Sequence, residues 1–157
     1  MDLPISALSP LQLNSHCFPV VHVRANPNGK ATGPAIAEQK VGSSPVQGQP
    51  DTWSLRLQLS LGSTDQSNPF LYEVDICAIG VVELSAEIPA DERQAVAVVN
   101  GLALLYGACR EMLMNITARS LHGPMSIPSL NFAQVVKEAQ ARRLSEKNTR
   151  RSELVKA

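Results

Sequence analysis

The side chains that most often carry out chemistry are few in this sequence of 157 residues, and they form no recognised motif. The three histidines, His16, His22 and His122, share no metal-ligand spacing with one another or with a cysteine. A metal site would have to be assembled from distant segments. We interpret the histidines as ordinary surface or loop residues, and we expect no metal ion and no other cofactor.

Glu73 and Asp75 have a spacing that could serve general acid–base catalysis, because they lie two residues apart and therefore on one face of a strand. No nucleophile or partner base accompanies them, and a solvated strand face explains them more simply. The segment 31–34, Ala-Thr-Gly-Pro, does not match a phosphate-binding loop. The sequence therefore favours a protein that is not an enzyme.

Cys17, Cys77 and Cys109 have no CxxC spacing and lie in apolar stretches. They are typical of reduced packing residues, not of disulfides or zinc ligands. The N-terminus lacks the basic start and apolar run of a signal peptide, and polar residues interrupt every long apolar stretch. We expect a cytoplasmic protein without a membrane insertion.

Lysine and arginine number 14, as do aspartate and glutamate, so the overall charge gives no argument for nucleic acid or a membrane surface. Aromatic residues make up only 4% of the chain, which leaves few stacking platforms for bases. The charge is uneven, because residues 137–157 carry seven basic and three acidic side chains. Two interpretations stay open: a solvated helix end with a frayed tail, or a basic arm that docks on a partner.

Four stretches predict β-strands. Residues 17–24 are β-rich but contain Pro19, which indicates a sheet edge or the start of a strand because proline cannot donate to the strand ladder. A weaker strand over 35–41 precedes a loop. Over 53–61 every odd residue is large and apolar and every even one is polar, as in a strand with one solvated face. The stretch 70–85 alternates at first, and both its faces then become apolar, so the second face needs a cover or a ligand.

The longest predicted element is a helix over 91–119, about 29 residues without proline and roughly 40 Å long. One apolar face comprises Val98, Leu102, Leu105, Cys109, Met112 and Ile116. A second comprises Val99, Ala103, Tyr106 and Leu113. A helix that is apolar on two sides needs two partners: its own sheet, and either a second subunit or an unusually thick core.

A shorter helix is predicted over 131–147. Strands first and helices last indicate an α+β fold with an antiparallel sheet. A chain of 16.9 kDa fits one domain, which we place at 16–147. A loose N-terminal arm over 1–15 precedes it, and a basic flexible tail over 148–157 follows it.

The order and spacing of several motifs resemble the SecB family of cytoplasmic protein-export chaperones. From the long helix onward, the matching residues are Arg110-Glu111, Arg119, the alternating aliphatics Met125 and Ile127, and Asn131-Phe132. Upstream, 60–62 (Ser-Leu-Gly) and 70–74 (Phe-Leu-Tyr-Glu-Val) are similar to the family's strand signatures. The resemblance covers about residues 53–132.

The resemblance implies a fold and an assembly. SecB subunits have a four-stranded antiparallel sheet with one long and one shorter C-terminal helix, and they form a tetramer, a dimer of dimers with the long helices between the sheets. On this basis we expect the oligomer interface at Val99, Ala103, Tyr106, Arg110 and Leu113. A groove for client polypeptide would lie between the second strand, the crossover and the last helix. The residues expected to line it are Ile36, Val41, Leu121, Met125, Ile127 and Val136.

The sequence departs from SecB where that family docks on the SecA motor. SecB proteins use acidic residues near the end of the first strand and just after Ser-Leu-Gly, whereas this chain has Arg24-Ala25-Asn26 and Ser63 there. Its tail is also basic where the family's is often acidic. SecA therefore stays an open partner, while the holding of unfolded chains is unaffected.

The resemblance implies an ATP-independent holdase that binds unfolded polypeptides or preproteins for export. A SecB-like chaperone dedicated to a toxin–antitoxin client is one alternative. Another is a hotdog-like thioesterase or small-molecule binder, since a long helix on an antiparallel sheet also describes that fold, although its helix lies near the start of the chain. A third is an interaction module that uses the basic tail.

Overall fold

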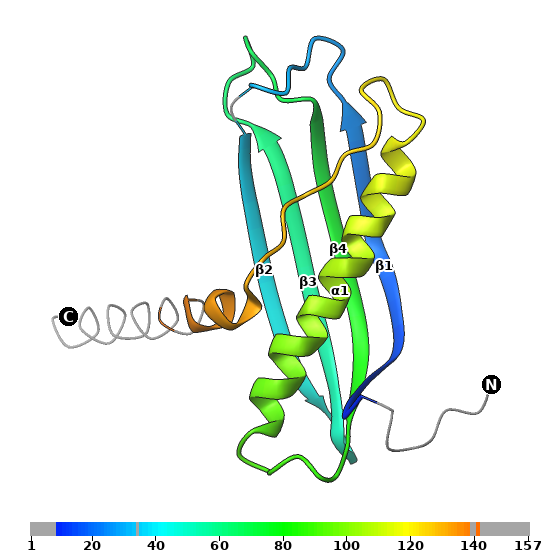
Figure 1. Cartoon of the computed structure of the whole chain (residues 1–157), viewed down its shortest axis with the longest axis vertical. Coiled ribbons are helices and arrows are strands. Elements are labelled where there is room, and N and C mark those ends of the chain that lie inside the picture. The colour runs from blue at the N-terminus through cyan, green and yellow to red at the C-terminus, as the bar shows by residue number, and fades with distance from the viewer. Residues whose placement is uncertain (1–8, 34, 139–140, 142–157) are drawn as a thin grey trace, which may run out of the picture.

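The computed structural model describes residues 9–33, 35–138 and 141, and it contains four strands followed by a long helix (Figure 1). The strands are β1 (Leu11–Ala25), β2 (Ala35–Val46), β3 (Gln49–Ser63) and β4 (Tyr72–Leu84), and the helix is α1 (Arg93–Thr117). A second, short helix covers residues 132–138. The prediction of an α+β fold with a four-stranded antiparallel sheet and two helices is confirmed.

The strands form one sheet in the order β1-β4-β3-β2, and every neighbouring pair is antiparallel. β1 is an edge strand, the first of the two positions that Pro19 indicated, and its pairing with β4 shifts register between Cys17 and Val20, where the proline lies. The other edge is β2, which turns into β3 through a tight hairpin. Gly48 in that hairpin has a φ of 77°, a conformation that favours glycine.

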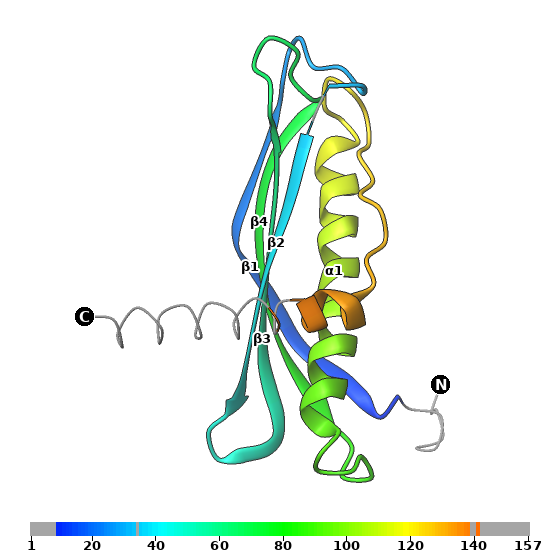
Figure 2. The same cartoon turned by 90° about the vertical axis from the view of Figure 1, so that its left-hand side faces the viewer.

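One face of the sheet carries α1, the segment after it and the second helix (Figure 2). Alternate residues of the two central strands are completely buried on this side: Leu55, Leu57, Tyr72, Ile76, Ala78 and Val82. Two glycines let the helix approach closely. A Cβ on Gly101 would lie 2.2 Å from Leu55 Cδ1, and one on Gly80 would lie 2.7 Å from Leu105 Cδ2.

The helix buries a broad stripe, which comprises Ala97, Val98, Gly101, Leu102, Leu105, Tyr106, Cys109, Leu113 and Thr117. Two residues predicted for the first apolar face lie outside it, since Ile116 is 41% exposed and Met112 is half-buried. By length and composition alone α1 could cross a membrane, but a helix with such a stripe packed on a sheet has the character of a core helix.

Several element boundaries differ from the prediction. β1 begins at Leu11, inside the segment predicted as a loose arm, and residues 1–8 and 148–157 lie outside the described residues. β2 continues to Val46, beyond the predicted strand end at 41, because its pairing with β3 outweighs its weak strand propensity. The helix begins at Arg93, just after the acidic residues that the sequence places in its first turn.

Candidate functional site

The crossover is the segment 118–131, which has no regular secondary structure and runs back along α1 (Figure 1). Its path starts at Thr117, which is completely buried. The Thr117 hydroxyl donates to the Leu113 carbonyl at 2.6 Å and accepts from the Met125 backbone N–H at 2.8 Å. One side chain at the end of the helix thus fixes the chain eight residues further on, where Met125 is buried against the core.

The tip of the crossover is tied to the far end of the sheet. The Tyr72 hydroxyl of β4 donates to the Gly123 carbonyl at 2.6 Å, and His122 Nε2 lies 2.7 Å from the Asn26 carbonyl. The rings of Tyr72 and His122 meet edge to face, 5.6 Å apart. His122, interpreted from the sequence as an ordinary loop residue, therefore links the crossover to the end of β1.

A second anchor holds the later part of the crossover on α1. The Tyr106 hydroxyl donates to the Pro128 carbonyl, and its ring packs on Phe132 with centroids 5.4 Å apart. Burial raises the pKa of the Tyr106 phenol, and this favours the protonated form that the hydrogen bond needs. Residues 126–130 are consequently held as a roof over the sheet.

Beneath this roof lies a hollow of about 180 Å³, here called the crossover hollow. Its walls come from β2, β3, β4, α1 and the crossover, and they are almost entirely apolar. The apolar side chains include Leu59, Leu61, Phe70, Val74, Met125, Ile127 and Leu130. Because apolar walls attract apolar ligand surface and offer few directional contacts, the hollow suits apolar side chains of different shapes.

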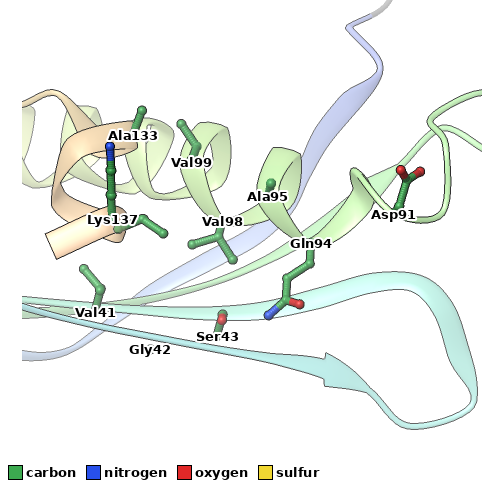
Figure 3. A pocket seen from close by; sticks show the side chains of 11 residues that line it. Val41, Gly42, Ser43, Asp91, Gln94, Ala95, Val98, Val99, Ala133 and Lys137 are labelled. Atoms are coloured by element: carbon green, nitrogen blue, oxygen red, sulfur yellow. The ribbon is translucent and has the colours of Figure 1, made fainter. Parts of the chain in front are cut away.

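A second hollow of about 370 Å³ lies between β2, the first turns of α1 and the second helix, and is here called the edge hollow (Figure 3). Val41, Val98 and Val136 give it an apolar part, while Asp91, Gln94 and Lys137 add polar groups. Figure 3 shows the Gln94 side chain pointing from α1 toward Ser43 of β2. The edge hollow is thus larger and more polar than the crossover hollow.

The residues predicted to line one groove are divided between these hollows. Val41 and Val136 line the edge hollow, whereas Met125 and Ile127 line the crossover hollow. Leu121 belongs to neither and is 66% exposed near the tip of the crossover. The side chain of Ile36 lies outside what the structure describes.

The residues predicted for the oligomer interface also have different surroundings. Tyr106 and Leu113 are buried inside the chain and line the crossover hollow. Val99 and Arg110 are half-buried, and Ala103 is exposed. The large apolar residues that α1 exposes are Leu104, Met114 and Ile116. Which of these residues contact another subunit stays a prediction.

The other candidates for chemistry do not assemble into a site. Glu73 pairs with Arg24 at 2.6 Å, and Asp75 accepts hydrogen bonds from Gln58 and Ser60. No group of three or more His, Cys, Asp or Glu side chains within residues 9–33, 35–138 and 141 could hold a metal ion. Cys77 and Cys109 are buried, as expected of packing residues, but Cys17 is exposed on the edge strand beside Pro19.

No protein-family model matches the sequence, and neither does any curated protein. Among solved structures, the Mycobacterium tuberculosis SecB-like chaperone, in complex with a ChAD peptide from the HigA1 antitoxin, is similar over 77% of this chain and 91% of its own, with 16% identity and a TM-score of 0.58. The fold is SecB-like. A protein of unknown function from Streptococcus agalactiae is similar over 75% of this chain and 96% of its own, with 13% identity and a TM-score of 0.43.

The SecB-like fold agrees with the order of elements, since α1 follows all four strands. A hotdog fold would place its helix near the start of the chain, so the fold that suggested a thioesterase is not the one observed. Sequence reasoning missed Leu59, Phe70 and Leu130 as walls of the crossover hollow. Alternation marks Leu59 as a core residue, but only the path of the crossover shows that it borders a hollow.

Proposed function

We propose that this protein is a molecular chaperone that holds unfolded polypeptide without ATP. The crossover hollow carries this proposal, because it is an apolar recess roofed by an irregular segment in a SecB-like fold. The M. tuberculosis protein of the same fold was captured with a peptide from an antitoxin, which supports polypeptide as the ligand. Clients would be unfolded preproteins or other chains that expose apolar segments.

The energetics favour a chaperone with several binding hollows. Covering ~500 Å² of client apolar surface contributes roughly 12 kcal/mol at ~25 cal/mol/Å², whereas association and ordering cost ~4–15 kcal/mol. One subunit would bind weakly, but several hollows engaged by one client raise the affinity ~100-fold or more through effective concentration. A homotetramer of the SecB kind would provide them, with α1 at its interface.

Delivery to SecA has less support than holding. Arg24 is paired with Glu73, the Asn26 amide donates to the Phe70 carbonyl, and the Ser63 hydroxyl accepts from the Phe70 N–H. These residues stand at positions that are acidic in SecB, and here they make their contacts within the subunit. A client of a toxin–antitoxin system in the cytoplasm is therefore the second candidate, and the antitoxin peptide on the M. tuberculosis protein favours it.

Aggregation of heat-denatured citrate synthase tests the holdase function. Stoichiometric wild-type protein should slow the light-scattering increase at least twofold. Ile127→Asp places a charge in the crossover hollow and should abolish this effect, whereas Leu121→Asp, on an exposed residue of the same segment, should retain it. A wild-type protein that does not slow aggregation, or equal behaviour of the two variants, would contradict the proposal.

A further inference from the structure

Arg110 is a half-buried cation beside the roof of the crossover hollow. It lies on α1 between Tyr106 and Leu113, at helical spacings that place the three side chains on one side of the helix. Tyr106 and Leu113 line the hollow, and Arg110 extends toward the crossover above them. Its guanidinium group therefore lies next to Ser126, which forms part of the wall of the hollow.

The contacts of this guanidinium group are weak. Nη1 lies 3.3 Å from the Ser129 hydroxyl and Nη2 lies 3.5 Å from the Ser126 hydroxyl, both at the long end of the hydrogen-bond range. Nε is enclosed and has no acceptor among the residues that the structure describes. Within the described residues no carboxylate oxygen lies within 4.0 Å of Arg110.

Arg93, on the same helix, has a guanidinium group with both a counter-charge and good hydrogen-bond acceptors, and it serves for comparison. It pairs with the Asp51 carboxylate and also donates to the carbonyls of Ile88 at 2.9 Å and Ala86 at 3.0 Å. A cation partly removed from water is costly without a counter-charge or good acceptors. Arg93 has both, whereas the contacts of Arg110 within the described part of the chain are two long ones to neutral hydroxyls.

We propose that Arg110, together with the hydroxyls of Ser126 and Ser129, binds a side-chain carboxylate of the polypeptide held in the crossover hollow. The planar guanidinium fork matches the two oxygens of a carboxylate, and each serine hydroxyl can rotate to donate to it. Ser126 itself lines the hollow, so the carboxylate site and the apolar recess share a wall. This inference rests on the proposed holdase function and specifies its clients further. They would be polypeptides with an apolar segment and an Asp or Glu within a few residues of it.

Calorimetric titration with paired peptides tests the carboxylate site. The probes are nine-residue peptides of Leu, Phe, Val and Ser, acetylated and amidated, with one Glu at successive positions, each with a Gln twin. The wild-type protein should bind the best Glu peptide about tenfold more tightly than its twin, and the ratio should fall as salt is raised. Arg110→Gln should reduce the ratio to about one without weakening the Gln peptide, whereas Arg119→Gln, on an exposed arginine near the end of α1, should leave it unchanged.

Any result that differs from these expectations would contradict the carboxylate site. Equal binding of Glu and Gln peptides by the wild-type protein, or a preference that survives in Arg110→Gln, would overturn the site while leaving the holdase function intact. Binding of no peptide would overturn both. Sedimentation of Arg110→Gln tests whether the carboxylate comes from another subunit. A mass lower than that of the wild-type protein would show that Arg110 pairs with another subunit and not with a client.

Discussion

The Thr117 hydroxyl and the Met125 backbone N–H are 2.8 Å apart, in a region from which water is excluded. This bond joins the end of α1 to the roof of the crossover hollow, and the same hydroxyl donates to the Leu113 carbonyl. Local helix geometry and the position of a binding wall therefore depend on one threonine.

Thr117→Val keeps the shape of the side chain and removes both hydrogen bonds. Because the Met125 N–H would be left buried without an acceptor, we expect the free energy of unfolding to fall by about 1–3 kcal/mol. Urea unfolding followed by fluorescence of the single tryptophan, Trp53, measures the change. Thr64→Val, on an exposed loop residue, is the matched control and should change stability by less than about 0.5 kcal/mol. Equal stability of both variants would contradict this role of Thr117.

Two glycines of α1 give a second prediction. Gly101→Ala should destabilise the protein by about 1–3 kcal/mol, because the new methyl group would lie 2.2 Å from Leu55 Cδ1. Gly107 faces open space on the same helix, so Gly107→Ala should stabilise it by up to about 1 kcal/mol through helix propensity. Thermal unfolding of the two variants should shift in opposite directions, and a shift in the same direction would contradict the close approach at Gly101.

The fold was predictable because a few elements carry strong patterns. The alternation from Trp53 to Leu61 has one physical solution, a strand with one buried face, and the long helix must cover that face. The extent of β2 was not predictable, because its glycine, serine and proline residues have weak strand propensity and only the pairing with β3 extends it to Val46. The extent of the central strand β3 could therefore be predicted better than that of the edge strand β2.

The candidate site was harder to predict than the fold, since it depends on an irregular segment. Met125 and Leu121 are both apolar crossover residues, and nothing in their local sequence shows that one is buried and the other is 66% exposed. The difference arises from Thr117 and Tyr72, which fix the crossover at Met125 and Gly123 through long-range hydrogen bonds. Such contacts leave no periodic signal in a sequence.

The buried thiol of Cys109 predicts a loss of stability at high pH. Burial raises its pKa from the ordinary value of 9.0 to about 11, with a smaller contribution from Cys77. The unfolded chain ionises the thiol near pH 9, whereas the folded protein keeps it neutral, so this contribution to stability is complete below pH 9 and disappears as the pH rises toward 11. Cys109→Ala should flatten the dependence of the unfolding free energy on pH between 9 and 11, measured by urea unfolding, and Cys17→Ala, on an exposed thiol, should not. An unchanged slope in Cys109→Ala would contradict the assignment.

The exposed side of α1 gives the last prediction, which concerns assembly. Leu104 and Met114 are each 45% exposed, whereas Tyr106 and Leu113 of the predicted interface are already covered by the chain itself. If the proposed tetramer forms through α1, the contact must use the side of the helix that the subunit leaves exposed. Substitution of Tyr106 or Leu113 would instead damage the subunit core before it affected assembly.

Leu104→Arg should therefore reduce the mass in sedimentation from about four subunits to a smaller species while circular dichroism stays unchanged. Leu121→Arg is the control and should leave the mass unchanged, because Leu121 is 66% exposed and lies outside α1. A tetramer that survives Leu104→Arg would move the interface away from this side of the helix, and a wild-type monomer would remove the multivalent binding that the holdase proposal requires.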